Sequence, residues 1–410
     1  VGVNSQNIRT LRVAIIPTLL VYTSIVWQMA GHLVIATLAA ARCAFGLVSS
    51  SAGFSAGYLD QIKLLRDERG KEFFTHAGVP VYTAEHSTPS PGGERVWMLT
   101  LEDDATDAEL SQVMQEVHPS AQQTHPDRGE IPFVEGRLTA DELLALLEKF
   151  RGRIKFVEED PFQQRVTEHV ELAVSGEARR SYPWGIASID AHVIRGRGAG
   201  VNVYVLDTGI RTTHVTFGGR AFAGVDVAST GLLTVCTPTS TTCATDNHYH
   251  GTHCAGTVGA STYGVADGAK LWAMKVLDDN GDGFIAWSIA AEQWVLSSGP
   301  KPAVVSMSLS GPGNWVAEET SINALVAAGV TVVVAAGNQN SDASGYNPGW
   351  IDSAITVGSY ASGGARSSFS NYGSKVDVWA PGSSIKSTGV SSDTATSWMS
   401  GTSMACPHVS

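Results

Sequence analysis

Six apolar runs rich in β-branched residues follow one another after Trp184, and they constrain the fold more than any other feature of the chain. They lie at Val201–Leu206, Leu271–Val276, Ala303–Leu309, Val330–Ala335, Ala354–Val357 and Val376–Trp379. Such runs are typical of strands that are buried on both faces. Helical patterns separate several of them, at 285–297 and 316–328. Repeated strand-helix-strand units predict an α/β fold with a doubly wound, mostly parallel sheet and right-handed crossovers.

Polar residues stand at the carboxyl ends of several of these runs. They are Asp207, Asp278, Ser308 and Asn338. In an open α/β sheet the carboxyl ends of the parallel strands meet at one edge, and functional residues gather there. We therefore expect a site in which these side chains take part.

A smaller unit is predicted ahead of the sheet, over residues 94–160. Strand-like runs at 96–101, 131–135 and 153–157 alternate with two helical patterns, and the second helix follows the capping box Thr139-Ala-Asp-Glu142. Strands alternating with helices over so short a length predict a small α+β domain of ferredoxin-like topology. Residues 53–93 show no clean periodicity and end in a turn-rich stretch, so we predict a linker there.

The two ends of the chain carry separate expectations. Residues 1–52 are predicted to be a signal peptide or an apolar targeting segment, because an apolar run at 33–48 follows Met29 and precedes small residues. Arg42 inside that run leaves a membrane anchor or a misassigned start as alternatives. The chain stops at Ser410 inside a predicted helix, so we expect its C-terminal domain to be truncated.

Charge and cysteine content narrow the class of protein. A net charge of -12 offers no basic stripe for phosphates, which argues against nucleic acid as a partner. Cys236 and Cys243 lie close together in a Thr-rich loop, and we predict a disulfide between them in an oxidising compartment, with two unpaired thiols as the alternative. Cys254 and Cys406 are expected to be small packing residues.

The first motif with chemical content is Asp207-Thr-Gly, at the end of a predicted strand. Pepsin-like aspartic peptidases use the same tripeptide in pairs. The sequence has no second copy, so a two-carboxylate mechanism lacks its partner. A strand-end turn held by the aspartate is the simpler alternative.

The second motif is His250-Gly-Thr-His253-Cys-Ala-Gly. Small residues around a histidine at a helix start let its imidazole reach a neighbouring strand end. A zinc cluster of His248, His250, His253 and Cys254 is the alternative. Since no His-Glu-x-x-His motif supplies a metallopeptidase base, we favour the metal-free interpretation, in which His253 is structural.

The third motif, Gly401-Thr-Ser403-Met-Ala, places a serine at the turn that opens a helix. A helix N-terminus offers backbone N–H groups and favours the negative charge of an acyl-transfer oxyanion. Ala335-Ala-Gly-Asn338 ends another strand, and Asn338 could donate a second hydrogen bond to that oxyanion. A plain N-cap and a turn-stabilising asparagine are the alternatives.

The order Asp, His, Asn, Ser with these flanking residues resembles the subtilase family, most closely its proteinase K-like branch, over residues 94–410. The resemblance implies a catalytic triad in which Ser403 is the nucleophile and His250 is the general base and then the general acid. Asp207 would orient the imidazole, while Asn338 and the Ser403 backbone N–H would hold the oxyanion. These roles are the ones known from subtilisin itself.

The resemblance also implies that an extended peptide binds as an added strand. The substrate-binding residues that it assigns are Asn280, Gly281, Gly283, Ser308, Leu309, Ser310, Ala335, Ala336 and Gly337. Ser310 stands where the related sequences have glycine, which leaves the fine specificity open. The small residues at 335–337 imply a preference for apolar or aromatic side chains.

No cofactor for catalysis is implied, and calcium is the one structural metal to consider. Asp377 matches a calcium ligand of the proteinase K branch, with carbonyls near Asp352 and Ala354 completing the set, although Asp352 replaces a proline. Asp278–Gly283 also mimics the start of an EF-hand loop. Its twelfth position would be Ile289 rather than Glu, so we expect no calcium there.

Residues 94–176 resemble the inhibitor-like propeptide of this family, and residues 177–410 resemble its catalytic domain. Such a propeptide assists folding and then occupies the substrate cleft. We expect self-cleavage between about 170 and 177, with Arg179-Arg180 as a competing site for another enzyme. The predicted protein is a secreted, monomeric serine endopeptidase acting on proteins or peptides and made as a self-processing zymogen. An inactive or propeptide-locked homologue is the alternative.

Overall fold

The computed structural model describes most of the chain from residue 63 onward. The described residues are 63–67, 71–84, 93–117, 122–124, 129–160, 162–164, 169–171, 182–193 and 197–410. The chain divides into two compact units, 1–51 and 52–410, and every described residue belongs to the second. The targeting segment expected at 1–52 lies outside the described residues. Among the helices that are described, none has the length and apolar character needed to cross a membrane.

An eight-stranded sheet forms the centre of the C-terminal part, as the apolar runs predict. Its order is β12 (Thr234–Val235), β11 (Ala221–Asp226), β13 (Lys270–Lys275), β10 (Asn202–Asp207), β15 (Ala303–Met307), β17 (Thr331–Ala335), β19 (Ile355–Tyr360) and β20 (Val378–Pro381). All neighbours are parallel except β11 and β12. From β10 the chain winds first toward β11 and then back through β15 to β20. The sheet is therefore doubly wound, and its strand order reverses beside β10.

β11 is a sheet strand that the apolar pattern does not predict. Its register against β13 shifts between Ala223 and Val225, where Gly224 is the extra residue. A bulge of this kind interrupts the alternation of side chains on which a strand prediction depends. A Cβ at Gly224 would lie 2.7 Å from the Met274 sulfur and 2.9 Å from a backbone carbonyl oxygen, so the close approach of β13 requires glycine.

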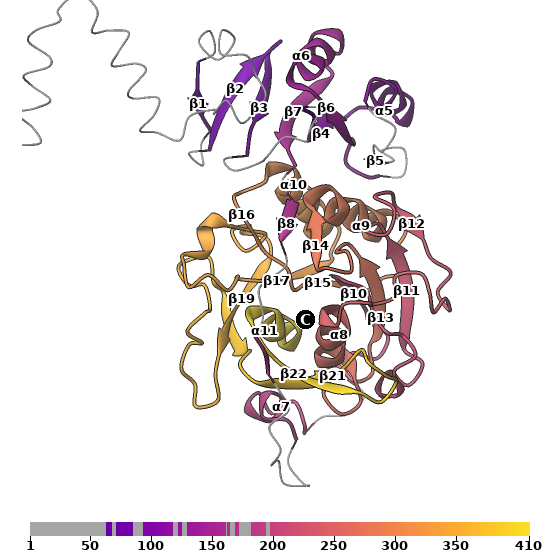
Figure 1. Cartoon of the computed structure of the whole chain (residues 1–410), viewed down its shortest axis with the longest axis vertical. Coiled ribbons are helices and arrows are strands. Elements are labelled where there is room, and N and C mark those ends of the chain that lie inside the picture. The colour runs from indigo at the N-terminus through magenta and orange to yellow at the C-terminus, as the bar shows by residue number, and fades with distance from the viewer. Residues whose placement is uncertain are drawn as a thin grey trace, which may run out of the picture. The chain divides into compact units, whose positions relative to one another are not determined.

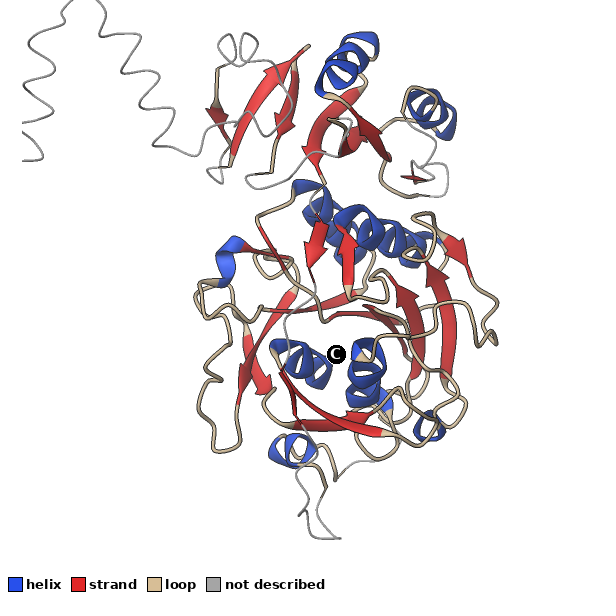
Figure 2. Ribbon diagram, viewed as in Figure 1, coloured by secondary structure: helices blue, strands red, loops and turns tan. Residues whose placement is uncertain are grey.

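Helices cover both faces of the sheet and complete a three-layer fold. On one side lie α9 (Ile285–Ser297) and α10 (Val316–Ala327), which pack together, and on the other side lie α8 (His250–Gly259) and α11 (Thr402–Val409) (Figure 1, Figure 2). Separate apolar clusters fill the two interfaces between sheet and helices. The predicted helices at 285–297 and 316–328 are thus confirmed, the second to within one residue.

The N-terminal part of the described chain is an α+β domain built on a seven-stranded sheet. Its strand order is β1 (Leu65–Arg66), β2 (Glu72–His76), β3 (Val79–Tyr82), β7 (Ile154–Glu159), β4 (Arg95–Leu101), β6 (Phe133–Leu138) and β5 (Gln122–Gln123). Two helices join these strands, α5 (Asp107–Met114) and α6 (Ala140–Lys149). The predicted capping box is present, since Thr139 Oγ1 accepts from Glu142 N at 3.3 Å and Glu142 Oε2 accepts from Thr139 N at 2.8 Å.

The linker expected over 53–93 is corrected by β1, β2 and β3. β2 and β3 form a hairpin across Ala77 and Gly78, both of which have positive φ, and β3 pairs in parallel with β7. An alanine with positive φ is uncommon, so this tight turn carries no Asn-Gly or Asp-Gly signal in the sequence. The strands are also short, which hides their alternation.

Two small sheets pair strands of the segment after Asp160 with strands of the C-terminal part. β8 (Phe162–Gln164) pairs with β14 (Asp282–Phe284), and β9 (His169–Glu171) pairs with β22 (Thr396–Ser400). The remaining described elements are the strands β16 (Gly311–Pro312), β18 (Tyr346–Asn347) and β21 (Ile385–Thr388), the helix α7 (Trp184–Ser188) and the 3₁₀ helices η3 (Val215–Phe217) and η4 (Ala343–Gly345). Two short strands, β8 and β9, thus follow the N-terminal part in the chain.

Candidate active site

Asp207 is the last residue of β10, and its side chain is completely buried. Oδ1 accepts a hydrogen bond from Thr208 N at 2.7 Å and lies 2.7 Å from His250 Nδ1. Helix α8 can come this close because residue 251 is glycine: a Cβ there would lie 2.2 Å from the Gly209 carbonyl oxygen. The Asp-Thr-Gly and His-Gly motifs are thus two sides of one contact.

The N-terminus of α8 is held by Asp246, a residue that the motif search does not single out. Asp246 Oδ1 accepts from His248 N at 2.9 Å and Tyr249 N at 3.0 Å, and Oδ2 accepts from Thr252 N at 2.8 Å. Thr208 Oγ1 donates to Asp246 Oδ1 at 2.9 Å and accepts from Gly251 N at 3.0 Å. These bonds fix the first turn of α8, and with it the His250 ring, against the end of β10.

Ser403 lies in the first turn of α11, which packs against α8. Its Oγ donates to the Ser308 carbonyl at 3.2 Å, and Ser308 Oγ donates to the Ser403 carbonyl at 2.9 Å. Cys254 connects the two helices: its Sγ is 3.8 Å from His250 Nε2 and 3.4 Å from the Ser403 carbonyl oxygen. Asp207, His250 and Ser403 are all 0% exposed. The structure thus places Asp207 and His250 in direct contact and Ser403 at the buried start of the neighbouring helix, with Cys254 in contact with both His250 and Ser403.

Asn338 follows β17 and is oriented by Thr402. Asn338 Oδ1 accepts from both the backbone N–H and the hydroxyl of Thr402, each at 2.8 Å, and the same hydroxyl accepts from Gly337 N at 3.2 Å. Fixing the amide oxygen fixes the amide nitrogen as well. The orienting role of Thr402 is a feature that the sequence motif Gly-Thr-Ser contains but does not explain.

The two predicted substrate edges have different structural supports. The turn at Asn280–Gly281 leads into β14 and is held by Asp278, whose Oδ1 accepts from Asn280 N at 2.8 Å and Asp282 N at 3.0 Å. These bonds explain the alternating acids without an EF-hand. β14 in turn pairs with β8, with Gly283 opposite Gln163. The edge at 308–310 is tied directly to the site through Ser308 and Ser403.

The remaining predicted substrate residues meet beside Asn338. Ser310 is 2% exposed, and its Oγ lies 3.0 Å from the position that a Cβ on Gly337 would take. Ala335 and Ala336 are buried in the same turn, whose carbonyl at Ala336 accepts from Asn371 Nδ2 at 2.9 Å. Segments 308–310 and 335–337 therefore face each other across a close contact.

In the part of the chain that the structure describes, His248 and His253 do not converge with His250. Within the described residues, the one group of potential ligands that converges is Asp207, His250 and Cys254. His253 is bonded instead through Nε2 to the Ile385 carbonyl at 3.0 Å, and burial lowers its pKa to about 3. His248 stacks on Tyr249 at 3.8 Å. Burial also raises the pKa of Cys254 to about 12, so its thiol stays protonated near neutral pH.

Asp377, the predicted calcium ligand, lies just before β20. β20 is an edge strand of the large sheet, and three strands separate it from β10, which ends at Asp207. Its Oδ2 accepts from Thr356 N at 2.8 Å. The Asp352 side chain is ion-paired with Lys375 at 2.5 Å. One carboxylate with backbone carbonyls can contribute to a calcium site, which needs six to eight oxygens in all.

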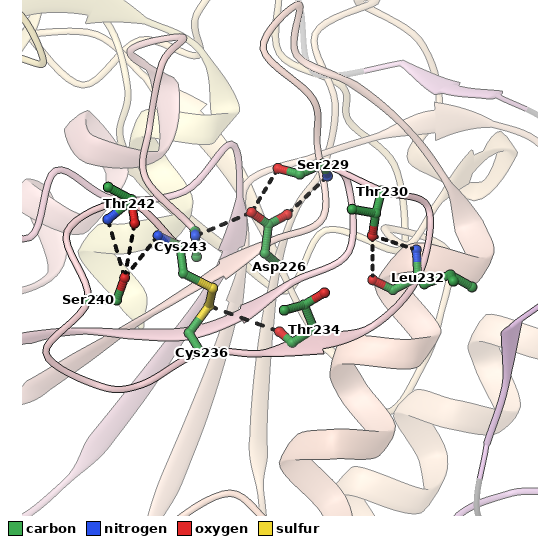
Figure 3. The surroundings of a disulfide bond; sticks show 10 residues. Asp226, Ser229, Thr230, Leu232, Thr234, Cys236, Ser240, Thr242 and Cys243 are labelled. Atoms are coloured by element: carbon green, nitrogen blue, oxygen red, sulfur yellow. Dashed lines mark hydrogen bonds between the residues drawn. A yellow bond between two sulfur atoms is a disulfide. The ribbon is translucent and has the colours of Figure 1, made fainter.

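The predicted disulfide between Cys236 and Cys243 is present, with 5.8 Å between the Cα atoms (Figure 3). It closes a surface loop after β12 in which Ser240 Oγ accepts from Cys243 N at 3.1 Å. The loop continues into Ala244, whose N–H donates to Asp226 at 3.3 Å and whose carbonyl accepts from Ile210 N at 3.1 Å. The disulfide therefore stabilises a loop that contacts the turn after Asp207.

Comparison with known proteins gives a consistent result. The sequence profile described as the subtilase family matches residues 198–410, which is half of the chain. An extracellular serine proteinase of Thermus sp. (strain Rt41A) is 47% identical over 234 residues, covering 55% of this chain and 54% of that protein. A cuticle-degrading protease of Metarhizium anisopliae is 40% identical over 289 residues, covering 67% of this chain and 68% of that protein.

A solved structure, that of a cold adapted subtilisin-like serine proteinase, is 36% identical and aligns with a TM-score of 0.48 over 59% of this chain and 78% of that chain. The chain spans about half the length of several curated relatives that it matches. The family profile covers all four residues Asp207, His250, Asn338 and Ser403, which the structure gathers at the ends of β10 and β17 and the starts of α8 and α11. The chain belongs to the subtilase family.

Proposed function

We propose that this protein is a serine endopeptidase with Ser403, His250 and Asp207 as its catalytic triad. The observation that carries the proposal is the buried 2.7 Å contact between Asp207 Oδ1 and His250 Nδ1. His250 begins helix α8, which packs against α11, the helix that holds Ser403 in its first turn. Two relatives that are named as a proteinase and a protease support the same activity. Asp207 keeps the imidazole in one orientation, so that Nδ1 faces the carboxylate and Nε2 serves the serine.

Hydrolysis would proceed through an acyl-enzyme, by the scheme known from subtilisin. Ser403 Oγ attacks the carbonyl carbon of the peptide bond while His250 Nε2 takes the serine proton. The C–N bond then breaks as His250 gives that proton to the leaving amine, which leaves an ester on Ser403. Water attacks the ester, its proton passes to His250, and the proton returns to Ser403 Oγ as the acid product leaves.

The oxyanion of each tetrahedral intermediate would be held by Asn338 and the backbone N–H of Ser403. Thr402 supports this role, because its two hydrogen bonds to Asn338 Oδ1 hold the amide in one orientation before any substrate arrives. A donor fixed in advance costs no reorganisation when charge develops. Thr402 is a positioning residue, since it acts through Asn338.

The N-terminal part, up to Asp160, would act as an inhibitory propeptide. Two of its carboxylates sit at the starts of the helices on the outer side of the sheet. Glu158 accepts from Val316 N at 3.0 Å and Ala317 N at 2.6 Å, and Asp160 accepts from Ile285 N and Ala286 N, each at 3.0 Å. Carboxylates at helix N-termini satisfy otherwise unpaired N–H groups and interact favourably with the helix dipole.

The chain after Asp160 supports the proposal that the propeptide occupies the substrate edge. β8 pairs antiparallel with β14, the predicted edge, and β9 pairs antiparallel with β22, which ends at Ser400 just before the Ser403 helix. These two pairings favour a first cut between Gln164 and His169. Sequence spacing alone favours 170–177, of which residues 172–177 lie outside the described part of the chain.

Secretion, a monomeric state and a preference for apolar or aromatic side chains complete the proposal. The Thermus relative is named as extracellular, and a disulfide is at home in an oxidising compartment. Proteins or peptides are the proposed substrates, and the chain's own propeptide is the proposed inhibitor.

Structural calcium at Asp377 is a separate proposal. Asp377 and the carbonyls of residues 352 and 354 would hold the ion, which would tie the segment before β19 to β20. We expect a chelator to lower the melting temperature of the protein and Asp377→Asn to abolish that effect. An unchanged melting temperature after chelation would exclude the site.

The main test compares the secreted full chain with its Ser403→Ala variant by intact mass and N-terminal sequencing. We expect the unmodified chain to lose its propeptide and the variant to keep it. If both chains stay full length, the protein is an inactive homologue. If both are trimmed alike to Ser181 or Tyr182, another enzyme cuts at Arg179-Arg180 and the self-processing proposal fails.

A further inference from the structure

We propose that the β2–β3 hairpin, residues 71–82, is an inhibitory element of the propeptide, fastened to the catalytic part by Lys71. This inference rests on the proposed function of residues 94–160 as the propeptide, and it extends that inhibitor toward the N-terminus. The segment that binds at the start of α10 is then residues 71–82 of this same chain. Four observations carry the argument.

The hairpin is built into the propeptide sheet. β3 pairs in parallel with β7, with Val81 opposite Val157, and β2 pairs with β3. Phe74 and Val81 are both 0% exposed. Ala84 N, just after the hairpin, donates to Glu159 Oε2 at 3.0 Å, and Glu159 is also ion-paired with Arg95 inside the domain. The hairpin is therefore held in a fixed position relative to β7.

Lys71 reaches from the hairpin to the catalytic part. Its Nζ donates to the Asn314 carbonyl at 2.5 Å and to Glu158 Oε1 at 2.7 Å. The same ammonium lies 4.3 Å from the centre of the Trp315 ring and 4.9 Å from that of Tyr82. The side chain is only 18% exposed. Asn314 and Trp315 immediately precede α10, so this contact is to the start of that helix.

The contact is also an electrostatic one. The Glu158 side chain is 0% exposed, and within the described residues Lys71 is the cation that pairs with it. Glu158 uses its oxygens to hold Val316 N and Ala317 N. A buried carboxylate without a cation is costly, because burial removes its hydration. Lys71 therefore makes it possible for Glu158 to hold the start of α10 as a carboxylate.

Apolar packing surrounds this charged contact. Tyr82 shares a core cluster with Phe133 and Phe156 of the propeptide sheet and with Ile285 and Trp315 of the catalytic part. Phe73 packs on Tyr82 with 5.3 Å between ring centres. Lys71 thus lies between two aromatic faces, an arrangement that favours a desolvated cation. The hairpin contributes both the cation and one of the rings.

The proposal predicts that the hairpin sets how firmly the propeptide binds after it has been cut. The test uses the full chain with Lys71→Met, and with Lys155→Met as the matched control. Lys155 lies on β7 of the same sheet, and its ammonium pairs at 2.7 Å with Asp103, an exposed residue of the N-terminal part. Loss of one charge-assisted hydrogen bond corresponds to about a tenfold weakening.

Two measurements follow. In the Ser403→Ala background, hydrogen exchange of the amides at 316 and 317 should become about tenfold faster with Lys71→Met and stay unchanged with Lys155→Met. In the otherwise unmodified chain, the lag before peptidase activity appears should shorten about tenfold with Lys71→Met alone. With Glu158→Gln already in place, Lys71→Met should have less than about a threefold effect, because the neutral amide needs no cation.

If Lys71→Met and Lys155→Met give the same exchange rates and the same lag, the hairpin is not an inhibitory element. Should Lys71→Met not fold, Trp315→Leu tests the same contact from the catalytic side, and unchanged exchange over residues 71–84 would overturn the proposal. The exchange measurement needs no catalysis. Faster exchange in Lys71→Met without any activity in the unmodified chain would therefore support the hairpin contact while refuting the proposed peptidase.

Discussion

The helix pairs on the two faces of the central sheet are capped from different sources. At the start of α8, the amides of residues 248, 249 and 252 donate to Asp246, which belongs to the same part of the chain. The helices α9 and α10 begin after Phe284 and Trp315, neither of which supplies a side-chain cap. Their first amides donate instead to Asp160 and Glu158 of the N-terminal part.

The cap of α8 would therefore stay with the catalytic part permanently, whereas maturation would remove the caps of α9 and α10. The pair α8 and α11 carries His250 and Ser403 and is complete without the propeptide. The pair α9 and α10 takes its capping carboxylates from the proposed propeptide, so under that proposal its first amides are a specific docking surface before processing. We call these the catalytic pair and the docking pair. Removing a carboxylate beside the catalytic pair should lower activity, whereas removing one beside the docking pair should weaken propeptide binding.

The largest expected effect is a loss of catalytic activity when a carboxylate beside the catalytic pair is changed. Asp207→Asn should lower kcat/KM by about 10⁴-fold, the loss known for the Asp→Asn change in a chymotrypsin-type Ser-His-Asp triad, because the amide favours the wrong imidazole tautomer. Asp160→Asn makes the same chemical change at the docking pair. It should leave kcat/KM of the matured enzyme unchanged, and steady-state kinetics on a peptide substrate distinguishes the two. Equal losses in both variants would show that the division into pairs is wrong.

Asn338 tests the catalytic pair at one remove, since its orientation depends on Thr402 at the start of α11. Asn338→Ala should lower kcat by about 10²- to 10³-fold with little change in KM, because the oxyanion develops only after substrate has bound. Asn323→Ala on α10 is the matched control, because Asn323 is exposed and its side-chain oxygen accepts from the Ser353 hydroxyl at 2.6 Å. A rise in KM with kcat unchanged would assign Asn338 to ground-state binding instead.

The fold of the catalytic part was predictable because its strands and helices are marked by composition alone. β10, β15 and β17 lie in apolar runs rich in β-branched residues, and α9 begins and ends where its pattern predicts. β11 and the β2–β3 hairpin were not predictable. The first contains the bulge at Gly224, and the second turns through Ala77 with positive φ, so neither shows the regular alternation that a strand prediction uses.

The candidate site was predictable in its motif residues and not in their supports. Asp207, His250 and Ser403 stand in short motifs whose small neighbours allow close approach. Asp246 caps amides that follow it within six residues but stands outside the motifs, whereas the Lys71 contact joins residues far apart in the sequence. A buried aspartate that caps a helix looks, in sequence, like any aspartate in a loop. Only the fold shows that its carboxylate faces the start of α8.

The two helix pairs should also differ in how pH affects the stability of the protein. Burial lowers the pKa of His253 to about 3 and that of His408 to about 4, and both lie in the catalytic pair. Since their unfolded pKa is near 6.5, stability should be full above that pH and fall by about 1.4 kcal/mol per unit and per histidine below it. His253→Gln should therefore flatten the decrease in melting temperature between pH 6.5 and 4.5.

The docking pair should give the opposite dependence. Burial raises the pKa of Glu292 on α9 and of Glu318 on α10. A carboxyl group with a raised folded-state pKa costs stability as pH rises above its unfolded pKa, because ionisation is easier in the unfolded chain. Glu292→Gln should raise the melting temperature at pH 8 more than at pH 5. If His253→Gln changed the melting temperature mainly at alkaline pH, or Glu292→Gln mainly at acid pH, the assignment of acid sensitivity to the catalytic pair and alkaline sensitivity to the docking pair would be wrong.

The smallest effect, and the sharpest test of the comparison, comes from removing one cap on each side. Asp246→Ala and Asp160→Ala each remove a carboxylate from a helix N-terminus, so each should cost about 1–2 kcal/mol of stability where the cap is in use. Thermal melts of the unprocessed Ser403→Ala chain should show both losses. In chains that keep Ser403, once the propeptide has been cut and removed, only Asp246→Ala should still lower the melting temperature. The docking pair of the mature protein then has no carboxylate from Asp160 to lose. A loss from Asp160→Ala that persists in the mature enzyme would mean that the propeptide does not leave, and the inhibitory role of residues 71–160 would need a different explanation.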